Sequence, residues 1–211
     1  MMEKHAASPY LYEKLKARVL SGAHLPGERL DAPALSMEFG ASLTPIRAAL
    51  YRLVGDRLIE THPNNGFHMP RVTEPALRDL YDWNETILVQ AVRRCRSAAT
   101  EIPVESIDDE GEGLVSRTER LFERIVGLSG NGEFRHALDQ TNARLHPIRR
   151  RKAGLLPNTD EELATLEDAL SRQSFRQLEK ALASYHRRRQ AIVPEIVRRM
   201  HEPPPSSIAA W

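Results

Sequence analysis

The side chains with the clearest chemistry lie together on one short segment, residues 42–55. Arg47 and Arg52 carry guanidinium groups, which can bond the edge of a guanine bidentately or hold a phosphate. Ser42 and Thr44 stand at the start of the segment, where hydroxyls and the free N–H groups of a helix N-terminus suit a phosphate. The plainer alternatives are a solvated helix face for the arginines and a simple helix cap for Ser42. An exposed helix would make all four residues candidate DNA contacts.

Hydrophobic spacing predicts that helix. Apolar residues recur at Ile46, Ala49, Leu50 and Leu53, which gives the helix one buried face and leaves Arg47 on the opposite one. Ser42 is predicted as the N-cap, and Pro45 falls in the first turn, where a missing N–H does no harm. A preceding helix is predicted from Asp31 to about Phe39, and Gly40 ends it. The segment therefore predicts two helices around a tight turn.

A β-hairpin is predicted immediately afterwards. Residues 58–61 and 67–69 flank the run His62-Pro63-Asn64-Asn65-Gly66, which contains the turn dipeptide Asn-Gly. Asn64, Asn65 and Gly66 would let the backbone approach a phosphate closely, or they simply close the hairpin. Helix, turn, helix and hairpin is the layout of a winged helix-turn-helix, whose second helix enters the DNA major groove.

These residues resemble a known family. The runs Pro26-Gly27-Glu28-Arg29-Leu30, Phe39-Gly40-Ala41-Ser42 and 44–53 (TPIRAALYRL) are similar to the N-terminal domain of GntR-type bacterial transcription regulators, over roughly residues 9–72. Residues 58–60 (LIE) and 64–66 (NNG) resemble its wing. The remaining, helical part of the chain resembles the effector-binding domain of the FadR-like branch, through its helix layout and the short sequence motifs at 128–131 (LSGN) and 142–145 (NARL). The resemblance implies a double-stranded DNA operator, a homodimer and a small organic acid or other small effector.

The chain departs from the family at two DNA-contact positions. The family usually has Ser-Arg-Thr-Pro where this chain has Ser42-Leu43-Thr44-Pro45, and Pro33 replaces an arginine common in the preceding helix. We therefore expect weaker or altered DNA recognition.

The C-terminal region departs further. The FadR-like branch often binds a divalent metal through one Asp and three His, and the resemblance places Glu119, Glu123, Leu163 and Tyr185 at those positions. Leucine cannot ligate a metal and neutral tyrosine is a poor ligand, so we expect no metal and no other cofactor. Glu119 and Glu123 share one helix face and still offer two oxygen ligands; otherwise they are a polar pair near a metal-free pocket or on the surface. His186 could replace Tyr185 if the register differs by one residue.

The remaining polar candidates are Asn84 and two basic runs. Asn84 stands where the branch often carries an arginine suited to carboxylates, so the candidate effector pocket comprises Asn84, Glu119, Glu123 and Tyr185. The runs Arg149-Arg150-Arg151-Lys152 and Arg187-Arg188-Arg189 lie at helix ends or on outer faces, and we expect them to be solvated surface rather than a nucleic-acid site.

The organisation along the chain is mostly helical. A first helix is expected over 8–22, and Pro70 to Pro75 is a linker. Further helices are expected over about 76–99, 114–128, 133–151, 158–172 and 174–201, with a loop at 100–112 and a disordered tail at 202–211. The predicted domains are a winged helix-turn-helix with a small hairpin wing over 1–72 and an all-helical bundle of five or six helices over 73–201.

Composition and charge limit the cellular compartment and the kinds of partner that we expect for this chain. Among 211 residues there is one cysteine, Cys95, which forbids an internal disulfide and is expected to be a buried structural thiol. No apolar run reaches the roughly 18 residues of a membrane span, and the first residues lack the apolar core of a secretory signal. We expect a cytoplasmic protein with no membrane partner. Charge over residues 1–75 is nearly balanced, so DNA binding would depend on dimerisation and base contacts.

The sequence leaves three functional classes to compare. The leading hypothesis is a dimeric, DNA-binding transcription regulator controlled by a small effector in the bundle; the alternative is a regulator whose bundle serves only dimerisation. An enzyme is disfavoured because the chain lacks Gly-x-Ser-x-Gly, His-Glu-x-x-His and a phosphate-cradling glycine loop. A winged helix reused for protein interaction is the third class, and salt-dependent binding to mixed DNA would argue against it.

Overall fold

The computed structural model describes residues 7–63, 65–98, 113–152 and 154–202. The chain divides into two compact units, one of Met1–Val72 together with Val197–Trp211 and the other of Thr73–Ile196. The expected loop at 100–112 lies outside the described residues, and so does the expected tail beyond Glu202.

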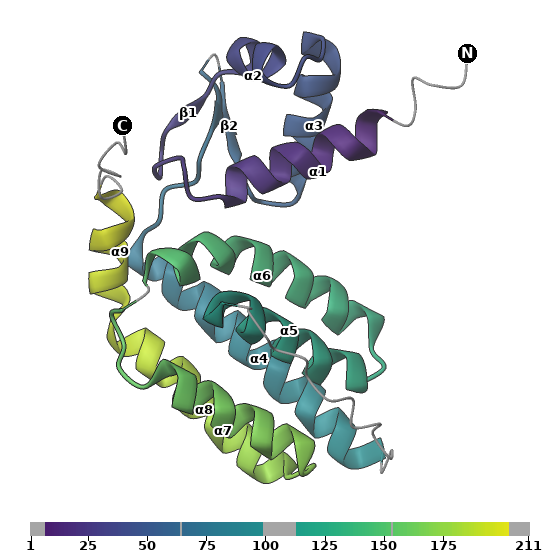
Figure 1. Ribbon diagram of the computed structural model, residues 1–211, viewed down its shortest axis with the longest axis vertical. Helices are drawn as coiled ribbons and strands as arrows, with labels where there is room; N and C mark the ends of the chain where they lie inside the picture. The colour runs from purple at the N-terminus through teal and green to yellow at the C-terminus, as the bar shows by residue number, and fades with distance from the viewer. Residues whose placement is uncertain (1–6, 64, 99–112, 153, 203–211) are drawn as a thin grey trace. The chain divides into compact units, whose positions relative to one another are not determined.

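The N-terminal unit is a small helical domain with a sheet at its edge (Figure 1). Its helices are α1 (Ala7–Leu20), α2 (Ala32–Glu38) and α3 (Leu43–Gly55), and its strands are β1 (Arg29–Leu30), β2 (Glu60–His62) and β3 (Gly66–His68). Helices α1 and α2 both pack against α3. The unit is held together by apolar side chains that are almost fully buried, namely Leu15, Ile46, Leu50, Leu53 and Ile59.

Local signals explain the ends of α2. The carboxylate of Asp31 accepts a hydrogen bond from the Ala34 N–H at 3.3 Å, as an N-cap does. Gly40 follows the helix with φ of +60°, a left-handed conformation that residues with a Cβ rarely adopt. The predicted helix from Asp31 to Phe39 and its end at Gly40 are therefore confirmed.

The sheet has one strand more than the sequence predicted. The strand order is β1-β3-β2, with β3 antiparallel to both neighbours, and Phe67 pairs with Leu30 on one side and Thr61 on the other. β1 is only two residues long, too short for an alternating pattern to be recognised. The two strands of the hairpin are Glu60–His62 and Gly66–His68, so their limits differ by one or two residues from the predicted 58–61 and 67–69.

The second unit is an all-helical bundle. Its helices are α4 (Glu74–Ala98), α5 (Leu114–Leu128), α6 (Gly132–Arg151), α7 (Thr159–Ser171) and α8 (Phe175–Ala191), and α9 (Val193–His201) begins in this unit. Helix α4 packs against α8, α5 and α6, as Figure 1 shows, and α7 packs against α8 and α5. Cys95 is buried in α4, as expected. The core has large, fully buried side chains from several helices, including Leu88, Phe122, Leu166 and Leu182.

The last predicted helix is two helices. We expected one helix from Ser174 to about His201 passing through Pro194, but the helix breaks at Ile192. Pro194 has no N–H to donate to the Gln190 carbonyl four residues back, and its ring would clash with that carbonyl. The Gln190 oxygen instead accepts a hydrogen bond from Arg78 Nη1 at 2.9 Å. No helix among the described residues is long and apolar enough to cross a membrane.

Candidate DNA interface and interior polar site

Helix α3 presents the face that the sequence predicted. Ile46, Leu50 and Leu53 are fully buried, whereas Thr44 and Arg47 on the opposite side are exposed. The guanidinium of Arg47 makes no hydrogen bond or ion pair with any residue that the structure describes. An arginine that serves no internal contact remains available for a base edge or a phosphate.

Ser42 occupies the N-cap position of α3 but does not cap it with its side chain. Its hydroxyl accepts no hydrogen bond from the helix, although it precedes the first helical residue with an extended φ of −67° and ψ of 160°. An N-cap hydroxyl normally bonds the N–H of the second or third helical residue. The third residue here is Pro45, which has no N–H. The Ser42 hydroxyl and the N–H groups of the first turn are thus left for another acceptor or donor, as a phosphate site requires.

Arg52 has an internal role that the sequence did not indicate. Its guanidinium carbon lies 3.9 Å from the ring centroid of Tyr12, which belongs to α1. The Tyr12 hydroxyl donates a hydrogen bond to the carboxylate of Asp56, and burial together with that contact raises the pKa of the tyrosine. Arg52 therefore fastens α1 to α3 through a cation–π contact, while still lying on the exposed surface.

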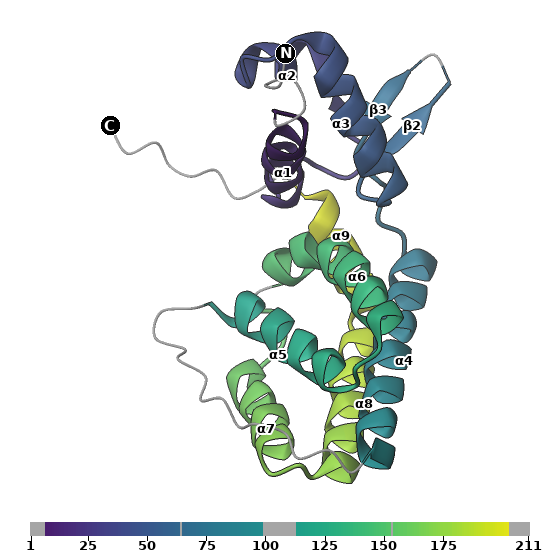
Figure 2. The same cartoon turned by 90° about the vertical axis from the view of Figure 1, so that its right-hand side faces the viewer.

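The wing is braced against α3 (Figure 2). The ring of Tyr51 on α3 meets Phe67 of β3 edge to face, with centroids 5.0 Å apart. In the turn, the Asn65 N–H donates to the His62 carbonyl at 3.1 Å, and Gly66 has a φ of +77°, which explains why glycine stands there. Asn65 and Gly66 are exposed at the tip, and Asn64 lies outside the described residues.

Arg29 lies near the wing, and nothing in the sequence marked it as a candidate. It is exposed on β1, and a Cβ placed on Gly66 would lie 4.0 Å from its Nε atom. This brings an arginine close to the tip of the wing. A two-residue strand gives no periodic signal, so only the pairing of β1 with β3 reveals the position.

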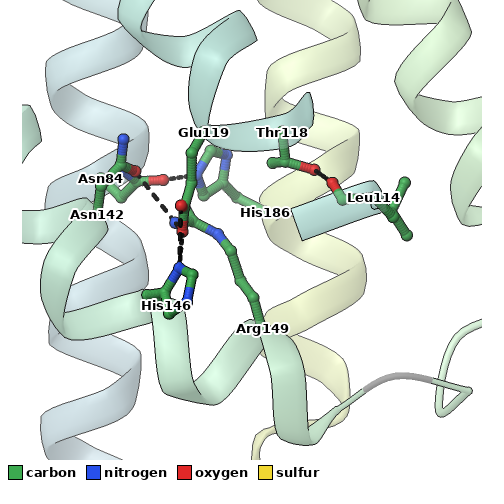
Figure 3. A network of polar contacts seen from close by, with 8 residues as sticks. All are labelled: Asn84, Leu114, Thr118, Glu119, Asn142, His146, Arg149 and His186. Atoms are coloured by element: carbon green, nitrogen blue, oxygen red, sulfur yellow. Dashed lines mark hydrogen bonds and ion pairs between the residues drawn. The ribbon is translucent and has the colours of Figure 1, made fainter. Parts of the chain in front are cut away.

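The interior of the bundle contains a network of polar side chains (Figure 3). The carboxylate of Glu119 lies 3.0 Å from Nδ1 of His146 and accepts a hydrogen bond from Arg149 Nη1, also at 3.0 Å. The same Arg149 nitrogen donates to Asn142 Oδ1 at 3.1 Å. Glu119, placed by the sequence in a candidate effector pocket, is thus the partner of a buried arginine.

Asn84 and His186 form a second, fully buried part of the network. His186 Nδ1 lies 2.8 Å from the Leu182 carbonyl and Nε2 lies 3.0 Å from the Asn84 side-chain oxygen. Burial, with nearby Arg189 and Arg149, lowers the pKa of His186 to about 3. The carbonyl of Leu182 can only accept, so Nδ1 carries the proton of the neutral ring and Nε2 is an acceptor. The Asn84 amide must then present its nitrogen, not its oxygen, to Nε2.

Basic side chains from both predicted surface runs are inside the bundle, so that expectation was wrong for them. Arg149 and Arg189 are each only 3% exposed, whereas Arg150 and Arg187 beside them are exposed. Consecutive residues on a helix are turned by about 100°, so a basic run at the end of a packed helix must send one member inward. A usable signal existed in the sequence, because Asn142, His146 and Arg149 recur at helical spacing beside buried Leu138 and Leu145.

The other basic groups gather around two tyrosines. The Arg189 guanidinium carbon lies 3.2 Å from the ring centroid of Tyr185, and Arg189 also pairs with Glu162 at 2.6 Å. Lys152 places Nζ 5.7 Å from the Tyr185 centroid and 5.9 Å from that of Tyr81. Tyr185, a candidate from the sequence, therefore lies at the centre of this basic group.

The four positions equivalent to the metal ligands do not come together as a ligand set. Leu163 belongs to the hydrophobic core, and Tyr185 packs edge to face on Phe122 with centroids 5.3 Å apart. Glu123 is exposed, and burial of its inner part beside Asp139 and Glu119 raises its pKa. Over the described ranges, no group of three or more His, Cys, Asp or Glu side chains is placed to hold a metal ion.

An exposed helix after a tight turn, braced by a three-stranded wing, defines a winged helix domain of the DNA-binding class, here joined to a helical bundle. Residues 9–69 match the family model of the bacterial regulatory proteins of the gntR family. Residues 9–69 therefore form a GntR-type DNA-binding domain, and the curated relatives to which the chain is similar are transcription regulators.

Curated relatives support this assignment. The chain is 24% identical over 155 residues to the HTH-type transcriptional regulator YdhC of Bacillus subtilis, which covers 66% of this chain and 69% of that protein. It is 31% identical over 120 residues to the Nta operon transcriptional regulator of Aminobacter aminovorans, covering 52% of this chain and 57% of the relative.

Solved structures share the fold. McbR/YncC of Escherichia coli superposes with a TM-score of 0.67 at 23% identity, covering 89% of this chain and 97% of that chain. A GntR regulator from Rhodococcus gives a TM-score of 0.72 at 15% identity, covering 90% of this chain and 98% of that one.

Proposed function

We propose that this protein is a homodimeric regulator of the FadR-like branch, acting in the cytoplasm on a pseudo-palindromic DNA operator under control of a small effector. The single observation that carries DNA reading is the exposed face of α3, on which Arg47 has no internal partner among the described residues. Ser42 and Thr44 at the helix start and Asn65 and Gly66 on the wing would contact the DNA backbone.

The bundle interior favours effector control over a bundle that serves only dimerisation. A bundle under selection only for packing gains nothing from burying Arg149, Arg189, Asn84 and His186, since buried polar groups destabilise unless they are fully satisfied. Several atoms of this group have no hydrogen-bond partner among the described residues. An effector bound there would change the spacing between the two DNA-binding domains of the dimer, and so change the affinity for the operator.

Selection of bound fragments from random double-stranded DNA tests the DNA-reading proposal. Two inverted half-sites with centres about 10 base pairs apart, or a multiple of it, are expected from a symmetric dimer. Fragments without symmetry, or no enrichment at low salt, would contradict it.

The Arg47→Ala variant tests the assignment of the reading face. Loss of a bidentate guanine contact is expected to cost about 1–3 kcal/mol per half-site, which weakens binding by roughly 5- to 150-fold for each half-site. The matched control is Arg187→Ala, which removes an exposed arginine from α8 in the other unit. Equal operator affinity for Arg47→Ala and Arg187→Ala, measured by fluorescence anisotropy, would exclude Arg47 as a DNA contact.

A further inference from the structure

The bundle interior has donors without acceptors. Each of the atoms concerned is buried and lacks a hydrogen-bond partner among the residues that the structure describes: Arg149 Nε and Nη2, Lys152 Nζ, Arg189 Nε, Asn142 Nδ2 and the Tyr81 hydroxyl. Leaving a buried donor unsatisfied costs roughly 1–3 kcal/mol. A set of such donors in one place indicates that something with several acceptor atoms completes the site.

The same region has more basic than acidic side chains. Arg149 pairs with Glu119, and Glu162 is shared between Arg189 and Arg188. Lys152 forms no ion pair within the described part of the chain. Burial and the nearby Arg189 and Arg149 lower the pKa of Lys152 well below its usual value. A bound anion would favour the protonated form of Lys152, which burial disfavours when no counter-ion is present.

The cations are close enough to act on one ligand. Arg149 and Lys152 are three residues apart at the C-terminal end of α6, and so lie on the same helix face. Lys152 Nζ and the Arg189 guanidinium both lie against the ring of Tyr185, at 5.7 Å and 3.2 Å from its centroid. Figure 3 shows Arg149 reaching toward Asn142 and Glu119 in this interior.

We propose that Arg149, Lys152 and Arg189 together hold one compact dianion, a dicarboxylate or a phosphate group, directly and without a divalent metal. The proposal rests on the effector control proposed above and names the chemistry of the effector. Tyr81 and Asn142 donate the neutral hydrogen bonds, and the flat guanidinium groups suit paired oxygen atoms. Leu163 and Tyr185 supply no metal ligands, and the guanidinium groups of Arg149 and Arg189 would repel a divalent cation.

Isothermal titration calorimetry on the full chain, treated with EDTA, tests the proposal. The probes are succinate, malonate and inorganic phosphate, with sodium chloride at matched ionic strength as the control. We expect saturable binding of one probe molecule per chain and a higher melting temperature with that probe, because a ligand that binds only the folded state stabilises it. The dicarboxylate and phosphate arms distinguish the two sources of the dianion.

Three outcomes of this titration would overturn the proposal. The first is that no probe binds at millimolar concentration. The second is that a probe binds only after zinc or nickel is added back. The third is that chloride has the same effect as the probes, which would mean screening rather than a site.

The Lys152→Met variant locates the site. The variant is expected to bind the probe roughly thirtyfold more weakly or worse, and to melt at a higher temperature than the wild type without ligand, because a buried unpaired amine is removed. The matched control is Arg150→Met, which removes an exposed positive charge two residues away and should leave the affinity unchanged. Wild-type affinity in Lys152→Met, or equal losses in both variants, would overturn the assignment.

Operator binding by the same preparation separates this inference from the proposed function. A chain that binds operator DNA but no dianion contradicts only the inference. A chain that binds a dianion but no DNA contradicts the proposed function and leaves the site intact.

Discussion

The buried, neutral His186 makes the stability of the bundle depend on pH in a defined direction. The imidazole is fully buried and its pKa is lowered from 6.5 to about 3. Above pH 6.5 the ring is neutral in both the folded and the unfolded chain, and it contributes no pH dependence. As the pH falls below 6.5 the unfolded chain binds a proton that the folded chain excludes, so the free energy of unfolding decreases until about pH 3.

The magnitude follows from the size of the shift. Each pH unit between the two pKa values is worth about 1.4 kcal/mol, so His186 alone lowers the free energy of unfolding by roughly 3 kcal/mol between pH 6.5 and 4.5. Such a loss is a large share of the stability of a typical domain, about 5–15 kcal/mol. Other groups also titrate in this range, and the His186 contribution must therefore be measured as a difference.

Urea unfolding of the wild type and of His186→Gln, followed by circular dichroism from pH 7.5 to 4.5, measures that difference. Glutamine keeps an amide near Asn84 but has no ionisable ring. We expect the variant to be less stable at pH 7.5 and to lose less stability on acidification, so that the two curves converge by roughly 3 kcal/mol at pH 4.5. Parallel curves across this range would refute the argument that His186 is held neutral.

Two further predictions concern the N-terminal unit. Arg52→Ala is expected to lower the free energy of unfolding by about 0.5–2 kcal/mol through loss of the Tyr12 contact, as measured by urea unfolding. It is also expected to weaken operator binding less than Arg47→Ala does, as measured by fluorescence anisotropy. A stronger loss of DNA binding in Arg52→Ala than in Arg47→Ala would reverse the assigned roles. Gly40→Ala places a Cβ on a residue with φ of +60° and is expected to lower the free energy of unfolding by about 1–2 kcal/mol. The added Cβ would meet no atom within 4 Å, so the loss would come from backbone strain alone. An unchanged melting temperature would show that this strain does not affect stability.

Only part of the candidate site could be predicted from the sequence. The winged helix could be predicted because its sequence signals are local: a cap at Asp31, a positive-φ glycine at position 40 and an apolar stripe on α3. Those features also place Arg47 outward without knowledge of the tertiary structure. Arg52 shows the limit, since exposure followed from helical spacing but its contact with Tyr12 depends on how α1 packs on α3.

The side-chain contacts inside the bundle were harder to predict from the sequence. The sequence drew attention to Asn84, Glu119 and Tyr185 through their resemblance to family positions, and these side chains do contact the interior network. It assigned the basic runs to solvent, because a run of arginines taken by itself does not show which member turns inward. For Arg149 the helical spacing from Leu138 and Leu145 was a usable signal, but its burial depends on the neighbouring helices that cover α6.

The sequence by itself determined the two helices of the helix-turn-helix, the turn between them, the hairpin of the wing and the outward face of α3, because caps, turn residues and apolar periodicity act over a few residues. The tertiary structure alone decided that Arg149, Lys152 and Arg189 meet around Tyr185, and that β1 joins the wing. The physical reason is that contacts between distant segments arise from packing, and a buried charge is defined by what surrounds it rather than by its place in the chain.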